Sequence, residues 1–230
     1  MAKDRMAVLA AMIDQGVIPV FSHPDVEVCI NVIQACADGG AKCIEFTNRG
    51  DFAARAFEEV TRHFAKADHS VVMGVGSVVD APTAGLYIAY GARFVVGPLL
   101  NAEIARLCNR RKIPYSPGCG SATEIGQAEE LGCEIVKLFP GGAVGGPDFV
   151  RAILGPMPWT RIMPTGGVDV SEASLRAWFS AGVAAVGIGS NLVTRQLLEA
   201  KDYKGVEARV RAAVELIQAI RAELAGAVGF

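Results

Sequence analysis

Aromatic residues, histidines and paired cysteines are scarce in this sequence, and each shortage excludes a class of protein. Aromatic residues make up only 7% of the 230 residues, too few to suit a β-sandwich held together by aromatic pairs. The three histidines are scattered, and the six cysteines include no Cys-x-x-Cys pair, so neither type has the spacing of a metal site. We therefore expect no bound metal, and we expect the cysteines to be reduced and buried, as in a cytoplasmic protein.

Long apolar stretches and an excess of basic charge are also missing. No stretch reaches the ~18 apolar residues that a membrane-spanning helix needs, and the first residues lack the apolar core of a signal peptide. The formal net charge of -2 gives no basic footprint for nucleic acid or for an anionic membrane. The sequence thus predicts a protein with neither a nucleic acid nor a membrane as its partner.

Short apolar segments alternate with longer segments of helical periodicity along the whole chain. Strands are expected at 17–21, 42–48, 70–75, 94–97, 113–117, 134–139, 161–164 and 184–188. Helices are expected at 25–38, 52–67, 81–90, 102–111, 122–131, 147–154, 171–180 and 192–198, with one more near each end, at 4–14 and 206–224.

The junctions between these segments repeat the same signals. Helix-capping side chains are expected at Asp51, Asp80, Asn101, Ser121 and Ser171, and glycines follow the helices. Eight strand–helix units joined by short turns predict an α/β fold, a single (β/α)8 TIM barrel with an extra N-terminal helix and a C-terminal helix. We expect one domain over residues 1–230. An open doubly wound sheet is the alternative, although no G-x-G-x-x-G follows the first strand.

One lysine lies inside a strand that is otherwise apolar. The segment from Ile135 to Phe139, followed by Pro140, is the kind of apolar run that is buried on both faces of a sheet, and Lys137 is in its middle. A lysine is rarely buried without a partner or a chemical role. Burial disfavours the ammonium form of a lysine, and the neutral amine attacks carbonyl carbons to form Schiff bases. Lys137 is therefore a candidate nucleophile, unless it reaches solvent or pairs with a carboxylate.

The second expected strand carries polar side chains on the face where apolar ones would be expected. Because side chains alternate along a strand, Glu45, Thr47 and Arg49 share one face. A buried salt bridge between Glu45 and Lys137 is the structural interpretation, but desolvation can cancel the Coulombic gain of such a pair. A functional pairing of the two residues is therefore at least as well supported.

Glycine-rich turns follow the last two expected strands. One reads Thr165-Gly166-Gly167 and the other Gly189-Ser190-Asn191. Backbone N–H groups in such turns, followed by a helix N-terminus, bind phosphate or carboxylate groups at the carboxyl ends of barrel strands. The third and fourth strands end near Ser77 and Pro98, which would lie at the same edge.

As an ordered set, these strand ends resemble the class I aldolases that act on 2-keto-3-deoxy-6-phosphogluconate and 4-hydroxy-2-oxoglutarate. The motifs are IEFTNRG, GVGSV, VGPLL, PGCGSATE, VKLFPG, PTGGV and GIGSNLV, and the similarity extends from Val17 to about Val193. The resemblance implies reversible cleavage of a 4-hydroxy-2-keto acid to pyruvate plus glyceraldehyde 3-phosphate or glyoxylate. It also implies that no metal or organic cofactor is needed and that the protein is a homotrimer.

The resemblance further implies a role for each matching residue. Lys137 resembles the Schiff-base lysine of the family, and Glu45 resembles its general acid/base. The other matching residues are expected to bind the keto-acid substrate. They are Arg49 and Thr165 around the pyruvyl carboxylate, Thr47, Ser77, Pro98 and Phe139 along the pocket, and Gly166, Gly167, Gly189 and Ser190 at an anion-binding end.

Two departures from the family pattern and one segment bear on the substrate. Ser77 stands where many members have threonine, which keeps the hydroxyl. Ser22 stands where many members have an arginine, so a phosphorylated substrate is less firmly implied. The segment SPGCGSATE also resembles relatives that act on the galactonate epimer, so an aldolase for the 6-phosphogalactonate epimer is an alternative.

Two other classes of protein fit the same barrel less well. A metal-dependent sugar-phosphate isomerase or epimerase needs His and Asp ligands at strand ends, and the sequence offers none there. A non-catalytic binder of small molecules is disfavoured because Lys137 and Glu45 are both present.

Overall fold

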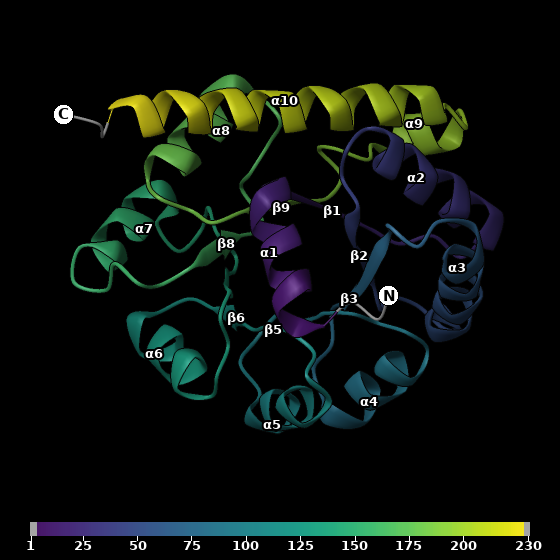
Figure 1. The fold of residues 1–230 in the computed structure, drawn as a ribbon, viewed down its shortest axis with the longest axis horizontal. Coiled ribbons are helices and arrows are strands. Elements are labelled where there is room, and N and C mark those ends of the chain that lie inside the picture. The colour runs from purple at the N-terminus through teal and green to yellow at the C-terminus, as the bar shows by residue number, and fades with distance from the viewer. Residues whose placement is uncertain (1–3, 228–230) are drawn as a thin grey trace.

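Parallel strands form the centre of the protein, and helices surround them (Figure 1). The computed structural model describes residues 4–227. The strands are β1 (Val17–Phe21), β2 (Cys43–Thr47), β3 (Val72–Gly76), β4 (Val95–Val96), β5 (Tyr115–Ser116), β6 (Gly118–Cys119), β7 (Val136–Leu138), β8 (Ile162–Pro164) and β9 (Val186–Ile188). The helices are α1 (Arg5–Gln15), α2 (Val26–Asp38), α3 (Ala53–Ala67), α4 (Ala81–Ala89), α5 (Ala102–Arg111), α6 (Ala122–Glu130), α7 (Gly146–Leu154), α8 (Glu172–Ser180), α9 (Arg195–Glu199) and α10 (Tyr203–Ala227).

Every pairing between the strands of the described chain is parallel, which confirms the α/β class. One sheet has the order β5-β4-β3-β2-β1-β9, and a second has the order β6-β7-β8. An isolated bridge between Thr165 and Gly187 links β8 to β9. Parallel strands of this kind present their carboxyl ends at one end of the molecule, where the loops that follow them meet.

The strand expected at 113–117 is the one that differs most from the structure. It is divided into β5 and β6 at Pro117, and it continues to Cys119. Proline has no N–H to donate to a neighbouring strand, so the ladder is interrupted there. The carbonyl oxygen of Pro117 nevertheless accepts a hydrogen bond from the N–H of Lys137 at 2.9 Å. The backbone of Lys137 therefore keeps its hydrogen bond to the neighbouring strand despite the interruption.

Most of the expected helix starts are confirmed by their caps. The side chains of Asp80, Asn101, Ser121 and Ser171 each accept a backbone N–H from the first turn of their helix. The prediction for Asp51 is wrong. The N-cap of α3 is Phe52, which has a left-handed φ of 63° and makes no side-chain cap hydrogen bond.

The helix expected at 192–198 begins later than predicted. It is α9, which starts at Arg195 because the hydroxyl of Thr194 accepts a hydrogen bond from the N–H of Leu197. Leu192 and Val193 are buried in the core instead of forming a first turn. Apolar periodicity alone did not distinguish a buried loop from a helix here.

Alternation along the strands divides the core in two. On β2, Ile44 and Phe46 belong to a large cluster that packs against the surrounding helices. Cys43, on the other face of β2, belongs to an inner cluster with residues of, or directly before, the other strands. That inner cluster also contains Val8, Leu9 and Met12 of α1, the purple helix that crosses the middle of Figure 1. Because α1 covers the amino-terminal ends of the strands, the carboxyl ends are left for a functional site.

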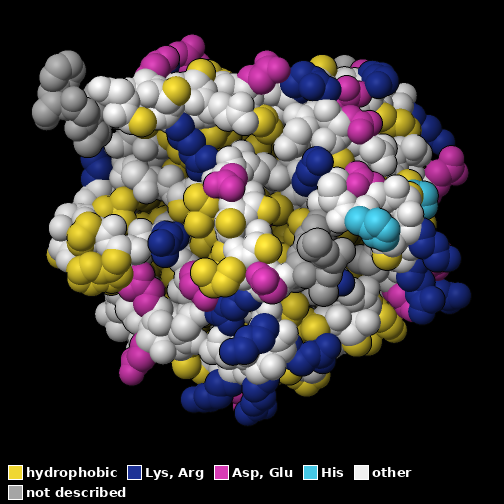
Figure 2. Space-filling model, viewed as in Figure 1, with side chains coloured by type: hydrophobic (Ala, Val, Ile, Leu, Met, Phe, Trp, Pro, Cys, Tyr) yellow, Lys and Arg dark blue, Asp and Glu magenta, His cyan; other side chains and the backbone are white. Residues whose placement is uncertain are grey.

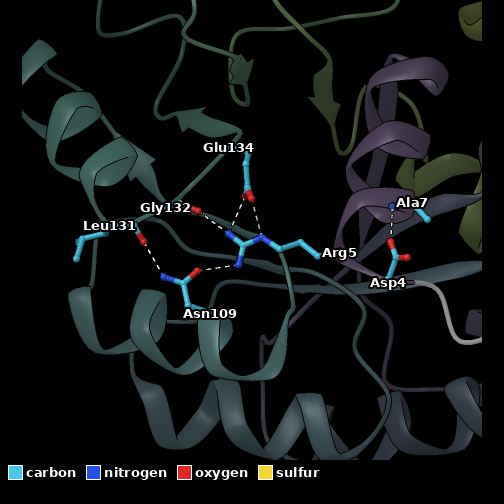
Figure 3. A network of polar contacts seen from close by, with 7 residues as sticks. All are labelled: Asp4, Arg5, Ala7, Asn109, Leu131, Gly132 and Glu134. Carbon is cyan, nitrogen blue, oxygen red and sulfur yellow. Dashed lines mark hydrogen bonds and ion pairs between the residues drawn. The ribbon is translucent and has the colours of Figure 1, made fainter.

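Arg5 holds α1 in this position (Figure 3). Its guanidinium donates to both carboxylate oxygens of Glu134 at 2.7 Å and to the amide oxygen of Asn109 at 2.7 Å. It also donates to the carbonyl oxygen of Gly132. Only 13% of the Arg5 side chain is exposed. The network therefore ties the first turn of α1 to α5 and to the loop before β7.

Arg5→Ala is expected to destabilise the protein by about 1–3 kcal/mol, because a part-buried, charge-assisted network loses its central donor. Urea unfolding measures the change. The control is Arg55→Ala, since the side chain of Arg55 is 81% exposed and its Nε lies 3.8 Å from Oε1 of Glu59. Exposed pairs of this kind contribute about 0–0.5 kcal/mol. Equally small changes in both variants would contradict the anchoring role of Arg5.

The surface around α1 is mixed in character. On the face drawn in Figure 2, apolar side chains lie in the middle and basic ones gather along the lower edge, over α5. The last turn of α5 carries Arg110 and Arg111. All six cysteines are buried. Within residues 4–227, no helix is both long enough and apolar enough to cross a membrane.

Candidate active site

Lys137 and Glu45 both project into the space enclosed by the strands, beyond the inner apolar cluster. Lys137 is on β7 and is 5% exposed, and Glu45 is on β2 and is 1% exposed. Their strand neighbours Val136, Leu138, Ile44 and Phe46 face outward into the large cluster. The ammonium nitrogen of Lys137 lies 4.9 Å from the ring centroid of Phe139. The sequence prediction that a lysine and a glutamate are buried here is confirmed.

The Glu45 carboxyl is held in an unfavourable place for a charge. Burial raises its pKa above the ordinary value, and the positive charges of Lys137 and Arg49 lower it in part. Its Oε2 has no hydrogen-bond partner within the described chain. Among the ion pairs of residues 4–227 within 4.0 Å, none joins Glu45 to Lys137. The salt-bridge interpretation of these residues is therefore wrong, and a carboxylate oxygen is left free for a ligand.

Arg49 and Ser77 lie at the mouth of this space. The side chain of Arg49 is exposed, and its Nε donates to Oγ of Ser77 at 3.4 Å. Ser77 has a left-handed φ of 60° directly after β3. Thr47, two residues before Arg49 in the chain, is 3% exposed. The structure therefore brings together the polar residues that the sequence placed at the ends of β2 and β3.

Pro98 lies close to Lys137 through an intervening glycine. Gly118 is the strand partner of Lys137. A Cβ atom on Gly118 would lie 2.2 Å from the carbonyl oxygen of Pro98, so the two backbones are in direct contact. Pro98 is half-buried and Phe139 is half-buried, as expected for residues that line an open pocket.

Thr165 directly follows β8, the strand that pairs with β7. Its N–H donates to the carbonyl oxygen of Leu138 at 3.0 Å, and its own carbonyl oxygen accepts from Gly141 at 2.9 Å. Its Oγ1 is buried and has no hydrogen-bond partner among the described residues. Thr165 thus supplies a second unpaired oxygen at the carboxyl ends of the strands.

The two glycine turns expected to bind an anion lie side by side. Gly166 and Gly167 are exposed, with left-handed φ values of 82° and 79° that favour glycine. The side-chain amide of Asn191 donates to the carbonyl oxygen of Val168 at 3.1 Å, which joins this turn to the one containing Gly189 and Ser190. Neither turn contains a lysine or arginine. Any anion held here would be bound by backbone N–H groups and hydroxyls.

Sequence reasoning gave no role to two glycines that lie against the Glu45 carboxyl and the Thr165 hydroxyl. A Cβ atom on Gly76 would lie 1.8 Å from Oε1 of Glu45. A Cβ atom on Gly187 would lie 2.4 Å from Oγ1 of Thr165. The available signal was a glycine at an inward-facing position of a strand, which often marks a close approach by another group.

The site cannot be identified from the volume of a cavity. A groove of about 730 Å³, lined in part by His69, Met73 and Arg93, lies at the amino-terminal end of β3, between α3 and α4. It contains none of the residues at the carboxyl ends of the strands. The site is instead identified by its buried amine and its two unpaired oxygens.

Comparison with known proteins gives the same assignment. A family model described as KDPG and KHG aldolase matches residues 8–226. The 2-dehydro-3-deoxy-phosphogluconate aldolase of Treponema pallidum is 33% identical over 201 residues, which cover 87% of this chain and 93% of that protein. The KHG/KDPG aldolase of Escherichia coli K12 is 30% identical over 200 residues, 86% of this chain and 91% of that protein.

A solved structure adds a chemical intermediate to this comparison. The KDPG aldolase of Legionella pneumophila, with pyruvate captured as a covalent carbinolamine, has a TM-score of 0.81 and 28% identity. The match covers 93% of this chain and 99% of that one. These findings confirm the resemblance drawn from the motifs. The chain belongs to the KDPG and KHG aldolase family and is a Schiff-base aldolase, a carbon–carbon lyase.

Proposed function

We propose that Lys137 is the nucleophile and Glu45 the general acid/base in reversible cleavage of a 4-hydroxy-2-keto acid to pyruvate and an aldehyde. The observation that carries the proposal is a buried amine beside a buried carboxylate whose Oε2 is unpaired in the described chain. The names of the relatives favour 2-keto-3-deoxy-6-phosphogluconate, which gives glyceraldehyde 3-phosphate, and 4-hydroxy-2-oxoglutarate, which gives glyoxylate.

The first half of the reaction builds an electron sink at C2. The Glu45 carboxylate takes a proton from Nζ of Lys137, and the neutral amine adds to the C2 ketone to give a carbinolamine. The Glu45 carboxyl delivers a proton to the C2 hydroxyl, which leaves as water. The product is a protonated imine between Lys137 and the substrate, whose positive charge can accept an electron pair.

The second half breaks the carbon–carbon bond. The Glu45 carboxylate takes the proton of the C4 hydroxyl while the C3–C4 electron pair moves onto C3, so the aldehyde leaves and an enamine remains. Glu45 returns this proton to C3. Water then adds to C2 and releases pyruvate and the free amine. One water leaves and one enters, so the cycle balances without an added co-reactant.

Thr165 and Arg49 are proposed to bind the pyruvyl carboxylate. Support comes from the unpaired Oγ1 of Thr165 and from the cationic side chain of Arg49 at the mouth of the same space. Thr47, Ser77, Pro98 and Phe139 are proposed to line the rest of the pocket. Gly166, Gly167, Gly189 and Ser190 are proposed to bind the distal anionic group of the substrate.

The most direct test of this activity is pyruvate release from a panel of substrates. The panel contains phosphorylated and unphosphorylated 4-hydroxy-2-keto acids, with both C4 epimers of the phosphorylated sugar acid. Release from at least one member is expected, and a protein that cleaves none of them would contradict the proposal. The half-buried Ser22, where many relatives have arginine, makes the phosphorylated members the informative ones.

Gly166→Val is expected to raise KM for phosphorylated substrates about tenfold more than KM for short unphosphorylated ones. A side chain at this left-handed position blocks close approach of a phosphate to the backbone. The two substrates are compared on the same variant, so any strain in the loop affects both. Equal increases would indicate that the turn shapes the fold without binding the anion.

We also propose that the strands close into a (β/α)8 TIM barrel that forms one domain over residues 1–230. The Thr165–Gly187 bridge joins the two sheets on one side, and Ala184 donates to Ile162 there at 2.9 Å. On the other side only Pro117 separates β5 from β6. Hydrogen exchange tests this closure. Amides of β8 and β9 are expected to be as protected as those of β2 and β3, and fast exchange at β8 and β9 would contradict it.

We further propose that the protein is a homotrimer. Large apolar side chains are exposed in the loops that follow β2, β3 and β4, where Phe52 is 83%, Val79 48% and Leu99 46% exposed. Such a group of exposed apolar side chains is typical of a protein interface. Sedimentation equilibrium is expected to give three times the chain mass of 24.1 kDa. A monomer would contradict the proposal.

A further inference from the structure

Gly76 leaves the space that the Glu45 carboxyl occupies. A Cβ atom at residue 76 would lie 1.8 Å from Oε1, 2.5 Å from Cδ and 2.8 Å from Cγ of Glu45. Atoms this close overlap, so the carboxyl and a methyl group on residue 76 cannot share these positions. Gly76 lies on β3 opposite Thr47 of β2, one inward position beyond Gly74, the strand partner of Glu45. The carboxyl therefore extends past its own strand partner toward the carboxyl ends of the strands.

Gly187 does the same for the Thr165 hydroxyl. A Cβ atom at residue 187 would lie 2.4 Å from Oγ1 and 3.4 Å from Cβ and Cγ2 of Thr165. The two residues also form the bridge between β8 and β9. The hydroxyl oxygen therefore points at the backbone of Gly187, and this oxygen is the buried one without a hydrogen-bond partner among the described residues.

Backbone conformation is not what requires glycine at these two positions. Neither Gly76 nor Gly187 has a left-handed φ, in contrast to Gly166 and Gly167. Their strand geometry is one that alanine adopts readily. The conflict would be with the ends of two side chains, which can rotate away. An alanine at either position would therefore allow the chain to fold while moving one oxygen.

Two other buried glycines, Gly74 and Gly118, differ from these because they are needed for packing. A Cβ atom on Gly74 would lie 2.1 Å from the ring of Phe94, a residue of the inner apolar cluster. One on Gly118 would meet the backbone of Pro98. At those two positions the neighbour is a core ring or a backbone, so substitution would disturb the fold itself.

We infer that Gly76 and Gly187 are positioning residues of the aldolase site, which leave room for the Glu45 carboxyl and the Thr165 hydroxyl to lie where the substrate needs them. The inference rests on the roles proposed for Glu45 and Thr165. Neither glycine is proposed to touch the substrate. Each acts only through the oxygen that occupies the space beside it.

A double-mutant cycle tests the first pair. Gly76→Ala is expected to lower kcat about 100-fold, the loss that a misplacement of about 1 Å can cause. In a Glu45→Ala background the methyl group has room, so adding Gly76→Ala should change the remaining kcat less than twofold. Gly126→Ala is the control, because no atom lies within 4 Å of a Cβ atom there, and its activity should match that of the parent protein.

Two further measurements separate positioning from packing. Displacing the carboxyl from its buried position should lower its pKa, so the acid limb of the rate profile of Gly76→Ala should move to lower pH. Gly76→Ala should also lower the melting temperature, and Glu45→Ala should restore it. If Gly76→Ala alone fails to fold while the double variant folds, the conflict still maps to Glu45.

The second pair has a different kinetic signature. Gly187→Ala should raise KM roughly tenfold with a smaller change in kcat, because it displaces a hydroxyl that binds the substrate carboxylate. In a Thr165→Ala background the same substitution should leave KM unchanged.

Equal losses in the parent and the truncated backgrounds would overturn the positioning role at either pair and leave the aldolase assignment intact. A Glu45→Ala variant with ordinary activity would instead overturn the role proposed for Glu45, before either glycine is considered.

Discussion

Lys137→Met abolishes turnover, with kcat reduced on the order of 10,000-fold or more, if this amine forms the imine. Methionine keeps the length and the apolar contacts of the lysine stem but has no nucleophile. A loss of activity therefore reports the missing amine and not a cavity in the strands. Residual pyruvate release is measured against a no-enzyme reaction.

The control for this variant is Lys42→Met, on an exposed lysine one residue before β2. It removes the same charge and should leave kcat within about twofold, as surface substitutions usually do. Circular dichroism and thermal melting establish that both variants fold. Ordinary turnover in folded Lys137→Met would contradict the assignment of the nucleophile.

Glu45→Gln is expected to lower kcat by about 100–10,000-fold, the usual contribution of a positioned acid or base. Glutamine has nearly the same shape, so it fits beside Gly76, but it cannot accept the C4 hydroxyl proton. Imine formation with pyruvate should continue slowly because the amine of Lys137 is still present. The variant therefore separates proton transfer from nucleophilic attack, which Lys137→Met cannot do.

The pH dependence of the parent enzyme gives a second view of Glu45. The carboxyl must be ionised to act as the base for cleavage, and burial raises its pKa. Activity is therefore lost as pH falls through this raised pKa, and the acid limb lies above the value of ~4.3 for an ordinary glutamate. In Glu45→Gln this limb should disappear. An acid limb that persists unchanged would mean that another group controls it.

The sequence was sufficient to predict most of the strands and the residues at their ends. Lysine and glutamate are seldom buried inside apolar strands, so the sequence alone identified Lys137 and Glu45 as candidate functional residues. Five of the residues expected around them, Thr47, Ser77, Pro98, Phe139 and Thr165, lie at the same end of the strands as Lys137 and Glu45. Strand periodicity was enough because parallel strands bring their ends together.

The sequence was not sufficient where backbone geometry or side-chain direction decides the structure. Pro117 interrupts a strand but still accepts a ladder hydrogen bond through its carbonyl group, so the predicted strand ended too early. Asp51 has a capping side chain, yet the left-handed Phe52 occupies the cap position. The conformation of Phe52 could not be predicted from its residue type, because residues other than glycine seldom have a left-handed φ.

The relation between Glu45 and Lys137 also could not be predicted from the sequence. Periodicity places both side chains inside the strands but does not give the direction in which each extends. Glu45 extends toward Gly76, and no ion pair to Lys137 forms in the described chain. For the same reason the sequence did not show which side chains lie beside the glycines at 76 and 187. Only the structure shows that oxygens of Glu45 and Thr165 occupy the space that a side chain at these two positions would fill.

Borohydride reduction in the presence of pyruvate tests the central claim most directly. Hydride reduces the imine to a stable secondary amine and fixes the pyruvyl carbons to the lysine that formed it. The expected result is one adduct per chain, on the peptide that contains Lys137, with loss of activity that requires both pyruvate and borohydride. An adduct on a different lysine, or no adduct with an active enzyme, would contradict the proposed mechanism.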